Sequence, residues 1–180
     1  MAMAHVRAHG KRSTGLESRL PRGNGQARSL RKSGLIDSRY APFHLKIRRS
    51  GIHGFGVFAL ETIPRGRNVI EYTGEHISRV EARRRFLRAW HSRDKRIYLA
   101  WLNPYWLIDG GYGGSGAELI NHCCAPNLQI KRTPNRIFFR SLRPIRRGEE
   151  LTIDYNFPKS DAQVPCCCGA AACRGTINRK

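Results

Sequence analysis

Acidic residues and long apolar runs are both scarce in this sequence. Its 180 residues include 13 Asp and Glu against 33 Lys and Arg, which gives a formal net charge of +20 at pH 7. Such a surplus of positive charge indicates a polyanionic partner, most often nucleic acid. No apolar run approaches the roughly 18 residues that a membrane-spanning helix needs, so we expect no membrane partner.

The sequence also gives no sign of a secretory leader or of a second domain. No apolar leader segment follows Met1, which argues against export. The chain is too short for two domains of about 100–150 residues, and a hydrophobic fraction of 40% is too high for full disorder. We expect one intracellular domain, in the cytoplasm or nucleoid of a bacterium, or in the nucleus or on the chromosome of a eukaryote. Nothing in the pattern indicates an oligomeric state.

The first 40 residues differ in composition from the rest. They carry nine Lys and Arg against two acidic residues, with Gly and Ser between them and little apolar periodicity. This pattern predicts a disordered basic tail over residues 1–42 that is suited to contact with nucleic acid. An organelle transit peptide has a similar Arg-rich, acid-poor composition and is the less favoured alternative.

From residue 43 the pattern changes to short β-type runs separated by turn signals. These runs cover residues 43–47, 57–59, 69–72, 97–102, 106–108, 128–131, 137–140 and 151–153. One helix is expected to begin after Ser78, because Glu81 completes a capping box and apolar side chains recur at positions 82, 86 and 90. Thr133-Pro134-Asn135 predicts a hairpin turn. The expected domain is mainly β, with one short helix.

Cysteine is absent from the first 122 residues, and the six cysteines that follow are clustered. Short spacing of this kind favours a metal site over a disulfide framework. Cys166, Cys168 and Cys173 offer three thiolates on one short loop, and Cys124 offers a fourth from a distant segment. Four sulfur ligands satisfy a closed, tetrahedral, structural zinc site. The alternative is that they are small buried apolar side chains; the two remaining cysteines are interpreted as reduced bystanders.

Three further segments contain residues that are able to carry chemistry. Residues 50–59 are glycine-rich, so a ligand could approach the backbone, although a tight turn is the commoner explanation. Asn121 and His122 lie beside a candidate metal ligand, and residues 148–155 place an acid next to the hydroxyl of Tyr155. Taken alone, none of these segments distinguishes a structural role from a functional one.

In order along the chain, five segments between residues 43 and 177 resemble the SET-domain protein-lysine methyltransferases. Ser-Gly-Ile-His-Gly-Phe-Gly-Val-Phe-Ala at 50–59 is similar to the family's opening glycine motif, and residues 71–75 and 81–82 to the strand and helix that follow. Asn-His-Cys-Cys-Ala-Pro-Asn at 121–127 and Gly-Glu-Glu-Leu-Thr-Ile-Asp-Tyr at 148–155 resemble two signature segments. The cysteines from position 166 to position 173 resemble the post-SET zinc motif.

The resemblance implies a SET domain over residues 43–158 and a post-SET zinc-binding segment over residues 159–180. It implies a SET-type fold of small curved sheets, in which residues 121–127 and 152–155 pass each other as a pseudoknot, with a C-terminal zinc-binding loop. The implied cofactor is S-adenosyl-L-methionine. The residues implied to hold it are His53, Gly54, Phe55, Gly56, Asn121, His122 and Ile177.

The implied reaction transfers the methyl group of this cofactor to the side-chain amine of a protein lysine. Such a reaction needs alignment and a neutral amine, and an apolar channel beside a sulfonium lowers the lysine pKa from about 10.4. Tyr155 resembles the family's catalytic tyrosine and Tyr98 the tyrosine of its lysine channel; a buried ring with a satisfied hydroxyl is the alternative for both. Ile153 stands where the family usually has Tyr or Phe, and its lack of a hydroxyl predicts that di- or trimethyl-lysine is formed.

The implied substrate is a lysine in a basic or chromatin-like protein such as a histone. A ribosomal or other non-histone protein is an alternative substrate. A non-enzymatic nucleic-acid-binding protein on a SET scaffold is an alternative function, which the charge supports and the intact motifs oppose. Cofactor binding distinguishes the two functions, because a pure binding module has no use for a methyl donor.

Overall fold

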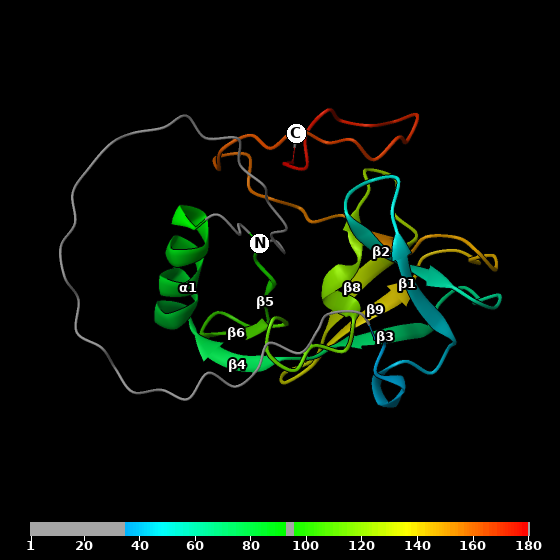
Figure 1. Cartoon of the computed structure of the whole chain (residues 1–180), viewed down its shortest axis with the longest axis horizontal. Helices are drawn as coiled ribbons and strands as arrows, with labels where there is room; N and C mark the ends of the chain where they lie inside the picture. The colour runs from blue at the N-terminus through cyan, green and yellow to red at the C-terminus, as the bar shows by residue number, and fades with distance from the viewer. Residues whose placement is uncertain (1–34, 93–95, 180) are drawn as a thin grey trace.

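The structure is a computed structural model, and it describes residues 35–92 and 96–179 (Figure 1). Ten strands and one α-helix were found in these residues, together with two short 3-10 turns. In chain order they are η1 (Ser38–Tyr40), β1 (Leu45–Arg49), β2 (Phe55–Ala59), β3 (Asn68–Tyr72), β4 (Glu75–Ser78), α1 (Arg79–His91), β5 (Leu99–Trp101), β6 (Trp106–Asp109), η2 (Ala117–Leu119), β7 (Asn121–His122), β8 (Leu128–Arg132), β9 (Ile137–Ser141) and β10 (Thr152–Ile153). The mainly β fold with one helix agrees with the sequence prediction.

The strands form four small sheets around one main core. β1 pairs with β2, β3–β9–β8 and β4–β6–β5 form two three-stranded sheets, and β7 pairs with β10. Alternating apolar residues on these short strands point inward, and Val57, Ile70, Phe139 and Leu151 are fully buried between the sheets. The predicted turn after β8 is present, with the N–H of Thr133 donating to the carbonyl of residue 136 at 2.9 Å.

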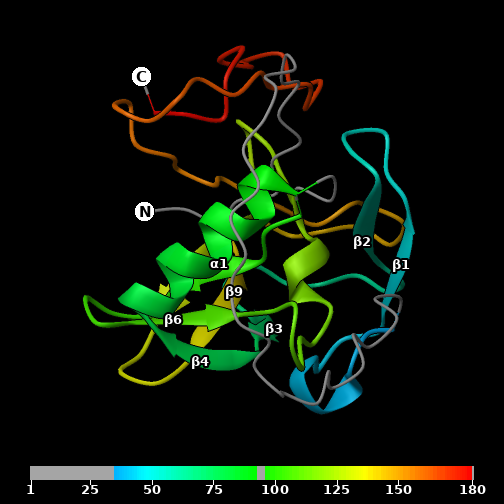
Figure 2. The same ribbon diagram turned by 60° about the vertical axis from the view of Figure 1, so that its left-hand side comes forward.

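Helix α1 begins where the capping box predicts. The Ser78 hydroxyl accepts a hydrogen bond from the N–H of Glu81 at 3.3 Å, which satisfies one of the donors that a helix N-terminus leaves unpaired. Figure 2 shows the helix lying across the sheet of β4, β5 and β6. Ala82 is the only buried residue of the helix; Ala89 and Trp90 pack partly on the core, and Val80, Phe86 and Leu87 are exposed.

Two strands differ from the sequence expectation. Strand β4 was not expected, because its four residues include Glu75 and His76, which break the apolar pattern of a strand. The expected strand at 97–102 covers Leu99–Trp101 alone. β6 pairs with both β4 and β5, and this sheet carries α1.

The folded part of the chain also begins earlier than residue 43. Ala41 is buried in the main core, and the N–H of Asp37 donates to the carbonyl of Ser115 at 2.9 Å. Ile36 packs so closely on Gly116 that a Cβ at that glycine would lie 2.6 Å from the Ile36 side chain. Residues 35–42 of the predicted tail are therefore packed on the domain, and residues 1–34 lie outside the described residues.

The two signature segments lie side by side, as the predicted pseudoknot requires. β7 and β10 pair in parallel, with Asn121 opposite Thr152 and His122 opposite Ile153. Asn127 extends the contact, since its amide nitrogen donates to the carbonyl of residue 150 at 2.7 Å and its amide oxygen accepts from the N–H of Thr152 at 2.8 Å. No helix in the described residues is long and apolar enough to cross a membrane.

Candidate active site and metal centre

A small cavity opens beside the paired strands β7 and β10. Its volume is about 140 Å³. The residues that line it are Ile52, His53, Asn121, His122, Tyr155, Val164, Pro165, Cys166, Cys167 and Ile177. Four of the seven residues proposed from the sequence to hold the cofactor are in this set, together with the proposed catalytic tyrosine. The fold thus brings together residues that are up to 124 positions apart in the chain.

The glycine-rich segment is held at the cavity by Asn121 and Glu150. The Asn121 amide donates to the carbonyls of His53 at 3.2 Å and Phe55 at 3.0 Å, and to the Glu150 carboxylate at 2.9 Å. The Ser50 hydroxyl donates to the same carboxylate at 2.8 and 3.0 Å and accepts from the N–H of Ile52 at 2.9 Å. One carboxylate therefore ties the loop of residues 50–55 to β7.

Gly54, Phe55 and Gly56 lie next to the cavity but do not line it. Gly54 has φ +50, a conformation that glycine adopts without strain. A Cβ at Gly56 would lie 2.2 Å from a carboxylate oxygen of Glu150, so glycine is needed at this position for Glu150 to reach Asn121. The ring of Phe55 is half exposed. These three residues support the cavity through the backbone.

His122 contacts both the segment of Tyr155 and a cysteine. Its Nδ1 accepts a hydrogen bond from the N–H of Tyr155 at 3.1 Å, and its Nε2 lies 3.4 Å from Sγ of Cys124. Accepting at Nδ1 leaves the proton of the neutral ring on Nε2, which faces the sulfur. The pKa of His122 is lowered to about 4, mainly by burial. The negative charge of Asp154 raises this pKa, and the positive charge of Arg174 lowers it. The ring is neutral at pH 7.

Tyr155 is buried at the wall of the cavity. Its hydroxyl donates to the carbonyl of Ile120 at 3.1 Å. Burial raises the pKa of Tyr155, and the nearby Tyr98 and Glu150 raise it further, so the hydroxyl stays protonated at pH 7. Tyr98 is half-buried and packs on the main core. Ile153 is fully buried in β10 and does not line either of the two cavities described in residues 35–92 and 96–179.

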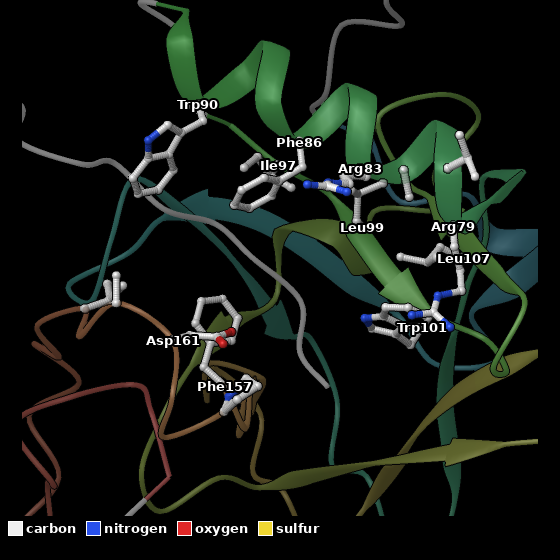
Figure 3. A pocket seen from close by; sticks show the side chains of 15 residues that line it. Arg79, Arg83, Phe86, Trp90, Ile97, Leu99, Trp101, Leu107, Phe157 and Asp161 are labelled. Carbon is white, nitrogen blue, oxygen red and sulfur yellow. The ribbon is translucent and has the colours of Figure 1, made fainter.

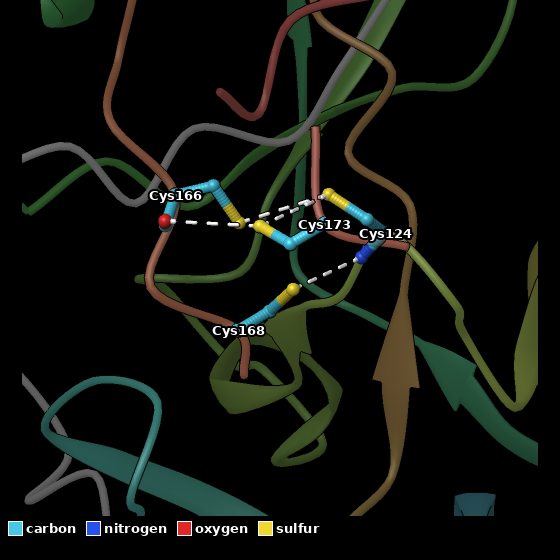
Figure 4. Close-up of side chains that lie close together, drawn as sticks. All are labelled: Cys124, Cys166, Cys168 and Cys173. Atoms are coloured by element: carbon cyan, nitrogen blue, oxygen red, sulfur yellow. Dashed lines mark hydrogen bonds between the residues drawn. The ribbon is translucent and has the colours of Figure 1, made fainter. Parts of the chain in front are cut away.

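Four cysteine sulfurs converge beside the cavity (Figure 4). The Sγ atoms of Cys124, Cys166, Cys168 and Cys173 all lie within 4.8 Å of one another. Sγ of Cys124 lies 3.8 Å from Sγ of Cys166 and 4.0 Å from Sγ of Cys173. Sulfurs at the corners of a tetrahedron around zinc, each about 2.3 Å from the ion, are about 3.8 Å apart. The donor set and its spacing fit a metal ion with four thiolate ligands.

Backbone N–H groups surround these sulfurs. Those of Arg174 and Gly175 donate to Sγ of Cys124 and of Cys173, each at 3.4 Å, and the N–H of Cys124 faces Sγ of Cys168 at 3.5 Å. N–H donors of this kind stabilise thiolates and orient them around a metal. The two cysteines interpreted as bystanders are not members of this cluster, although Cys167 lines the neighbouring cavity.

An ion pair connects the cysteine loop to the segment that contains Tyr155. The guanidinium of Arg174 donates to both carboxylate oxygens of Asp154, at 2.7 and 2.9 Å. Burial raises the pKa of Asp154, but the hydrogen bonds from Arg174 and from the N–H of Asn156 outweigh it, so the net effect is a pKa below the usual value of 3.8. Because Asp154 precedes Tyr155 and Arg174 follows Cys173, this pair joins the two halves of the site.

A second and larger cavity lies between α1 and the segment of residues 157–164. Its volume is about 750 Å³, and most of its lining is apolar. Figure 3 shows Phe86 and Trp90 pointing from α1 toward the segment that carries Phe157 and Asp161, with Leu99, Leu107 and Trp101 nearby. Val164 lines both cavities, so this groove and the small cavity share a wall.

The sequence pattern of the SET domain matches residues 54–156, more than half of the chain and nearly all of the strands described above. The chain belongs to the SET-domain family. Within this SET domain, the cavity residues of β7 and β10 and the glycine-rich loop lie inside the matched range, and the cysteine loop follows it.

Relatives of the SET domain carry names that agree with this assignment. The chain is 38% identical over 138 residues to "Histone-lysine N-methyltransferase SETD1A" of Homo sapiens, with 74% of this chain and 8% of that protein covered. It is 39% identical to set1 of Dictyostelium discoideum over 74% of this chain and 9% of that protein. It is 37% identical to trithorax of Drosophila melanogaster over 75% of this chain and 4% of that protein. The chain thus spans less than a tenth of the length of these relatives.

A solved structure supports the same fold. The crystal structure of KRYPTONITE in complex with mCHG DNA and SAH superposes on the SET domain with a TM-score of 0.64 and 28% sequence identity. The match covers 76% of this chain and 29% of that chain. The ligand and the DNA named there belong to KRYPTONITE.

Several residues of the site were not assigned from the sequence. Glu150 and Asp154 lie inside a quoted motif but received no role, since a motif does not state which partner an acidic side chain meets. Ser50, Arg174 and Val164 gave no signal, because their partners are distant in the chain. The groove at α1 was also missed, because the apolar positions 82, 86 and 90 were taken only as evidence for a helix.

Proposed function

We propose that this SET domain transfers a methyl group from S-adenosyl-L-methionine to the side-chain amine of a lysine in a protein. The main support is the small cavity, in which His53, Asn121, His122 and Ile177 surround one space that Tyr155 also lines. Relatives named as histone-lysine N-methyltransferases support the same reaction class.

The lining of the cavity fits part of the cofactor, because its volume of about 140 Å³ is smaller than the roughly 300–1,000 Å³ of a pocket for a drug-sized ligand. Asn121 and Glu150 hold the glycine-rich loop beside the cavity, and Ile177 supplies an apolar side chain from the C-terminal segment. When bound, the cofactor supplies an electrophilic methyl group on a positively charged sulfonium. Ile52 and His53 of the glycine-rich loop line the cavity, so this loop is placed to contact a bound ligand.

Tyr155 and Tyr98 orient the acceptor amine in this proposal. The Tyr155 hydroxyl is protonated at pH 7, so it acts by hydrogen bonding and alignment and does not act as a base. The apolar surroundings and the positive sulfonium of the bound cofactor would lower the pKa of the substrate lysine, so that the lysine loses its proton to water before the methyl transfer. Alignment of the neutral amine with the methyl group then accounts for most of the catalysis.

The four-cysteine cluster is proposed to hold a structural zinc ion. All four positions of a tetrahedral site are occupied by protein sulfurs, which leaves no open position for catalysis. Two hydrogen bonds extend the same segment into a lid over the cavity, from the N–H of Ile177 to the carbonyl of Val164 and from the N–H of Cys166 to the carbonyl of Gly175, each at 3.0 Å. The proposed role of the metal is to fold this lid.

The proposed substrate is a basic or chromatin-associated protein, bound to nucleic acid. A protein with net charge +20 repels a free basic segment, with a Debye length of about 8 Å at physiological salt. A polyanion that carries the substrate offsets this repulsion and raises the association rate. Activity on a nucleic-acid-bound substrate is expected to exceed activity on the free peptide, with the excess falling steeply as salt is raised. Equal methylation rates on the nucleic-acid-bound substrate and on the free peptide at low salt would contradict this proposal.

Replacement Tyr155→Phe tests the proposed function. The variant removes only a hydroxyl that hydrogen-bonds one carbonyl, so it is expected to fold and to bind cofactor by calorimetry while losing most methyl transfer. Tyr105→Phe is the matched control, because the Tyr105 ring is 75% exposed and lines neither cavity. Failure of the unmodified protein to bind S-adenosylmethionine would favour the non-enzymatic nucleic-acid-binding alternative.

A further inference from the structure

Two tight turns of the domain, residues 64–67 and 146–149, are joined to each other through the backbone. They follow Ile63 and Ile145, which form an antiparallel bridge in which each N–H donates to the opposite carbonyl at 2.9 Å. Both isoleucines are fully buried, so this bridge fixes the two turns to the core. The two segments lie at the end of the molecule opposite α1 (Figure 1).

Each turn presents an arginine at the same position. Arg65 and Arg147 are the second residues of the two turns, and both are exposed. The third residue is glycine in both turns, with φ +76 at Gly66 and +87 at Gly148, a conformation that a side chain would strain. The fold therefore holds two positive charges on equivalent surface turns.

Further arginines surround these two. The Nε of Arg140 donates to the carbonyl of Gly66 at 2.8 Å, which places a third guanidinium beneath the first turn. The segments of residues 61–67 and 140–150 together carry six arginines, which we call the arginine surface: Arg65, Arg67, Arg140, Arg143, Arg146 and Arg147.

The acidic residues of the same two segments leave most of this charge unbalanced. Glu61 contacts His44, and the Glu150 carboxylate faces the glycine-rich loop. Glu149 pairs with Arg143. Within residues 35–92 and 96–179, the other five arginines of the surface form no ion pair. Like charges held together repel one another, so a polyanion that binds here relieves a repulsion that the fold maintains.

We propose that the arginine surface binds the phosphate backbone of double-stranded nucleic acid. All six cations are guanidinium groups, which bind phosphate oxygens through two parallel hydrogen bonds. The large apolar side chains that are exposed in the described residues all lie outside residues 61–67 and 140–150. The surface therefore lacks the apolar centre of a protein interface, the apolar face of a membrane-binding segment, and the aromatic rings on which a single strand stacks.

This inference goes beyond the proposed function. None of the six arginines lines either cavity, and binding of a duplex here does not require methyl transfer. It adds a defined surface of the folded domain to the basic tail of residues 1–42, which the composition indicates as the contact with nucleic acid. Backbone contacts of this kind position a protein on a duplex without reading its sequence.

A paired variant with a matched control tests the proposal. Arg65→Gln with Arg147→Gln removes one charge from each turn, and Arg88→Gln with Lys159→Gln removes two charges from exposed side chains outside the surface. Arg65→Lys with Arg147→Lys keeps both charges. Each pair is made in the full chain, and affinity for a duplex DNA of about 30 bp is measured by fluorescence anisotropy between about 50 and 200 mM salt, without cofactor or substrate.

The logarithm of the affinity is expected to fall linearly with the logarithm of the salt concentration, with a slope of about 0.9 per phosphate contact. The Gln variant of the two turns is expected to reduce this slope by about 1.8, equally on duplexes of unrelated sequence, and the Lys variant to keep most of it. The control pair should reduce the slope by less than about 0.9, the effect of one contact. Melting temperatures should be unchanged, since no side-chain partner of Arg65 or Arg147 is found in the described residues.

The same slope in the Gln variant of the two turns and in the control pair would overturn the proposal, and so would an unmodified protein that binds no duplex. Either result would leave the methyltransferase function intact, because the assay contains no cofactor. Absence of cofactor binding would instead overturn the proposed function and leave the duplex assay unaffected. Tighter binding to a polyglutamate peptide or to phosphatidylserine vesicles than to the duplex, lost in the Gln variant, would assign the surface to an acidic protein or a membrane and overturn the proposal.

Discussion

The ion pair between Arg174 and Asp154 is expected to hold the cysteine loop against the cavity. In the variant Arg174→Met, the backbone N–H that faces Cys124 is kept, so the metal cluster loses no contact. What is lost is a two-point hydrogen bond between the side chains of Arg174 and Asp154, which are 16% and 29% exposed, together with a hydrogen bond from the same guanidinium to the carbonyl of Ile177 at 3.4 Å. We therefore expect full metal content together with a weakened lid.

The size of this effect follows from the exposure of the two groups. A hydrogen bond to a charged partner contributes about 1.5–3 kcal/mol when buried, and an exposed ion pair contributes about 0–1 kcal/mol. Both side chains are mostly but not fully buried, so the loss is estimated at about 1–3 kcal/mol. If the lid covers the cofactor and the whole loss appears in binding, about 1–3 kcal/mol corresponds to an affinity for S-adenosylmethionine that is about 5- to 150-fold lower.

A double-mutant cycle measures the contact itself. Arg174→Met, Asp154→Asn and the double variant are compared by calorimetry with cofactor, and a coupling free energy of about 1 kcal/mol or more is expected. Arg136→Met is the control, because Arg136 makes a two-point contact with Glu71 of β3 and neither residue lines either cavity. Cofactor affinity unchanged in Arg174→Met, or lowered equally in Arg136→Met, would refute the reasoning.

The pH dependence of this contact has a definite sign. Asp154 has a pKa below its usual 3.8 in the folded state, so the stability that it contributes is fully present above pH 3.8 and is lost as the pH falls through the folded value. Neither partner titrates near neutrality. The difference in melting temperature between the unmodified protein and Arg174→Met is therefore expected to be constant between about pH 6 and 8.

Three further results are expected. Gly56→Ala should raise the KM for cofactor, because its Cβ would lie 2.2 Å from the Glu150 carboxylate. Gly51→Ala should leave this KM unchanged, since nothing lies within 4 Å of a Cβ there. The same KM in both variants would argue against the role of Glu150 in holding the glycine-rich loop to Asn121. Cys173→Ser should lose bound zinc and cofactor affinity while Cys167→Ser keeps its zinc, as measured by metal analysis. Because Ile153 has no hydroxyl, mass spectrometry should detect di- or trimethyl-lysine at long incubation, and product that stays monomethyl would contradict this role.

Local patterns determined a large part of this protein. Ser78 and Glu81 predict the start of α1 because a capping box depends only on residues three apart. The spacing of Cys166, Cys168 and Cys173 predicts a metal site, since three thiolates on one short loop lie close together, and the fold brings Cys124 to them from a distant segment. The family resemblance predicted that residues 121–127 and 152–155 pass each other, which periodicity alone does not indicate, and the structure shows that β7 and β10 pair there in parallel.

The tertiary structure decided which distant side chains meet. Ser50 and Glu150 are 100 positions apart, and Asp154 and Arg174 are 20 apart, so no spacing in the sequence pairs them. It also decided what contacts the apolar positions of α1, because their recurrence at 82, 86 and 90 predicts a helix but not what packs on it. Ala82 is buried and Trp90 packs partly on the main core, whereas Phe86 is 37% exposed beside the cavity of about 750 Å³ between α1 and the C-terminal segment. A periodic apolar face specifies that something covers it, and only the arrangement of the surrounding elements specifies whether that cover is the protein's own core or a ligand.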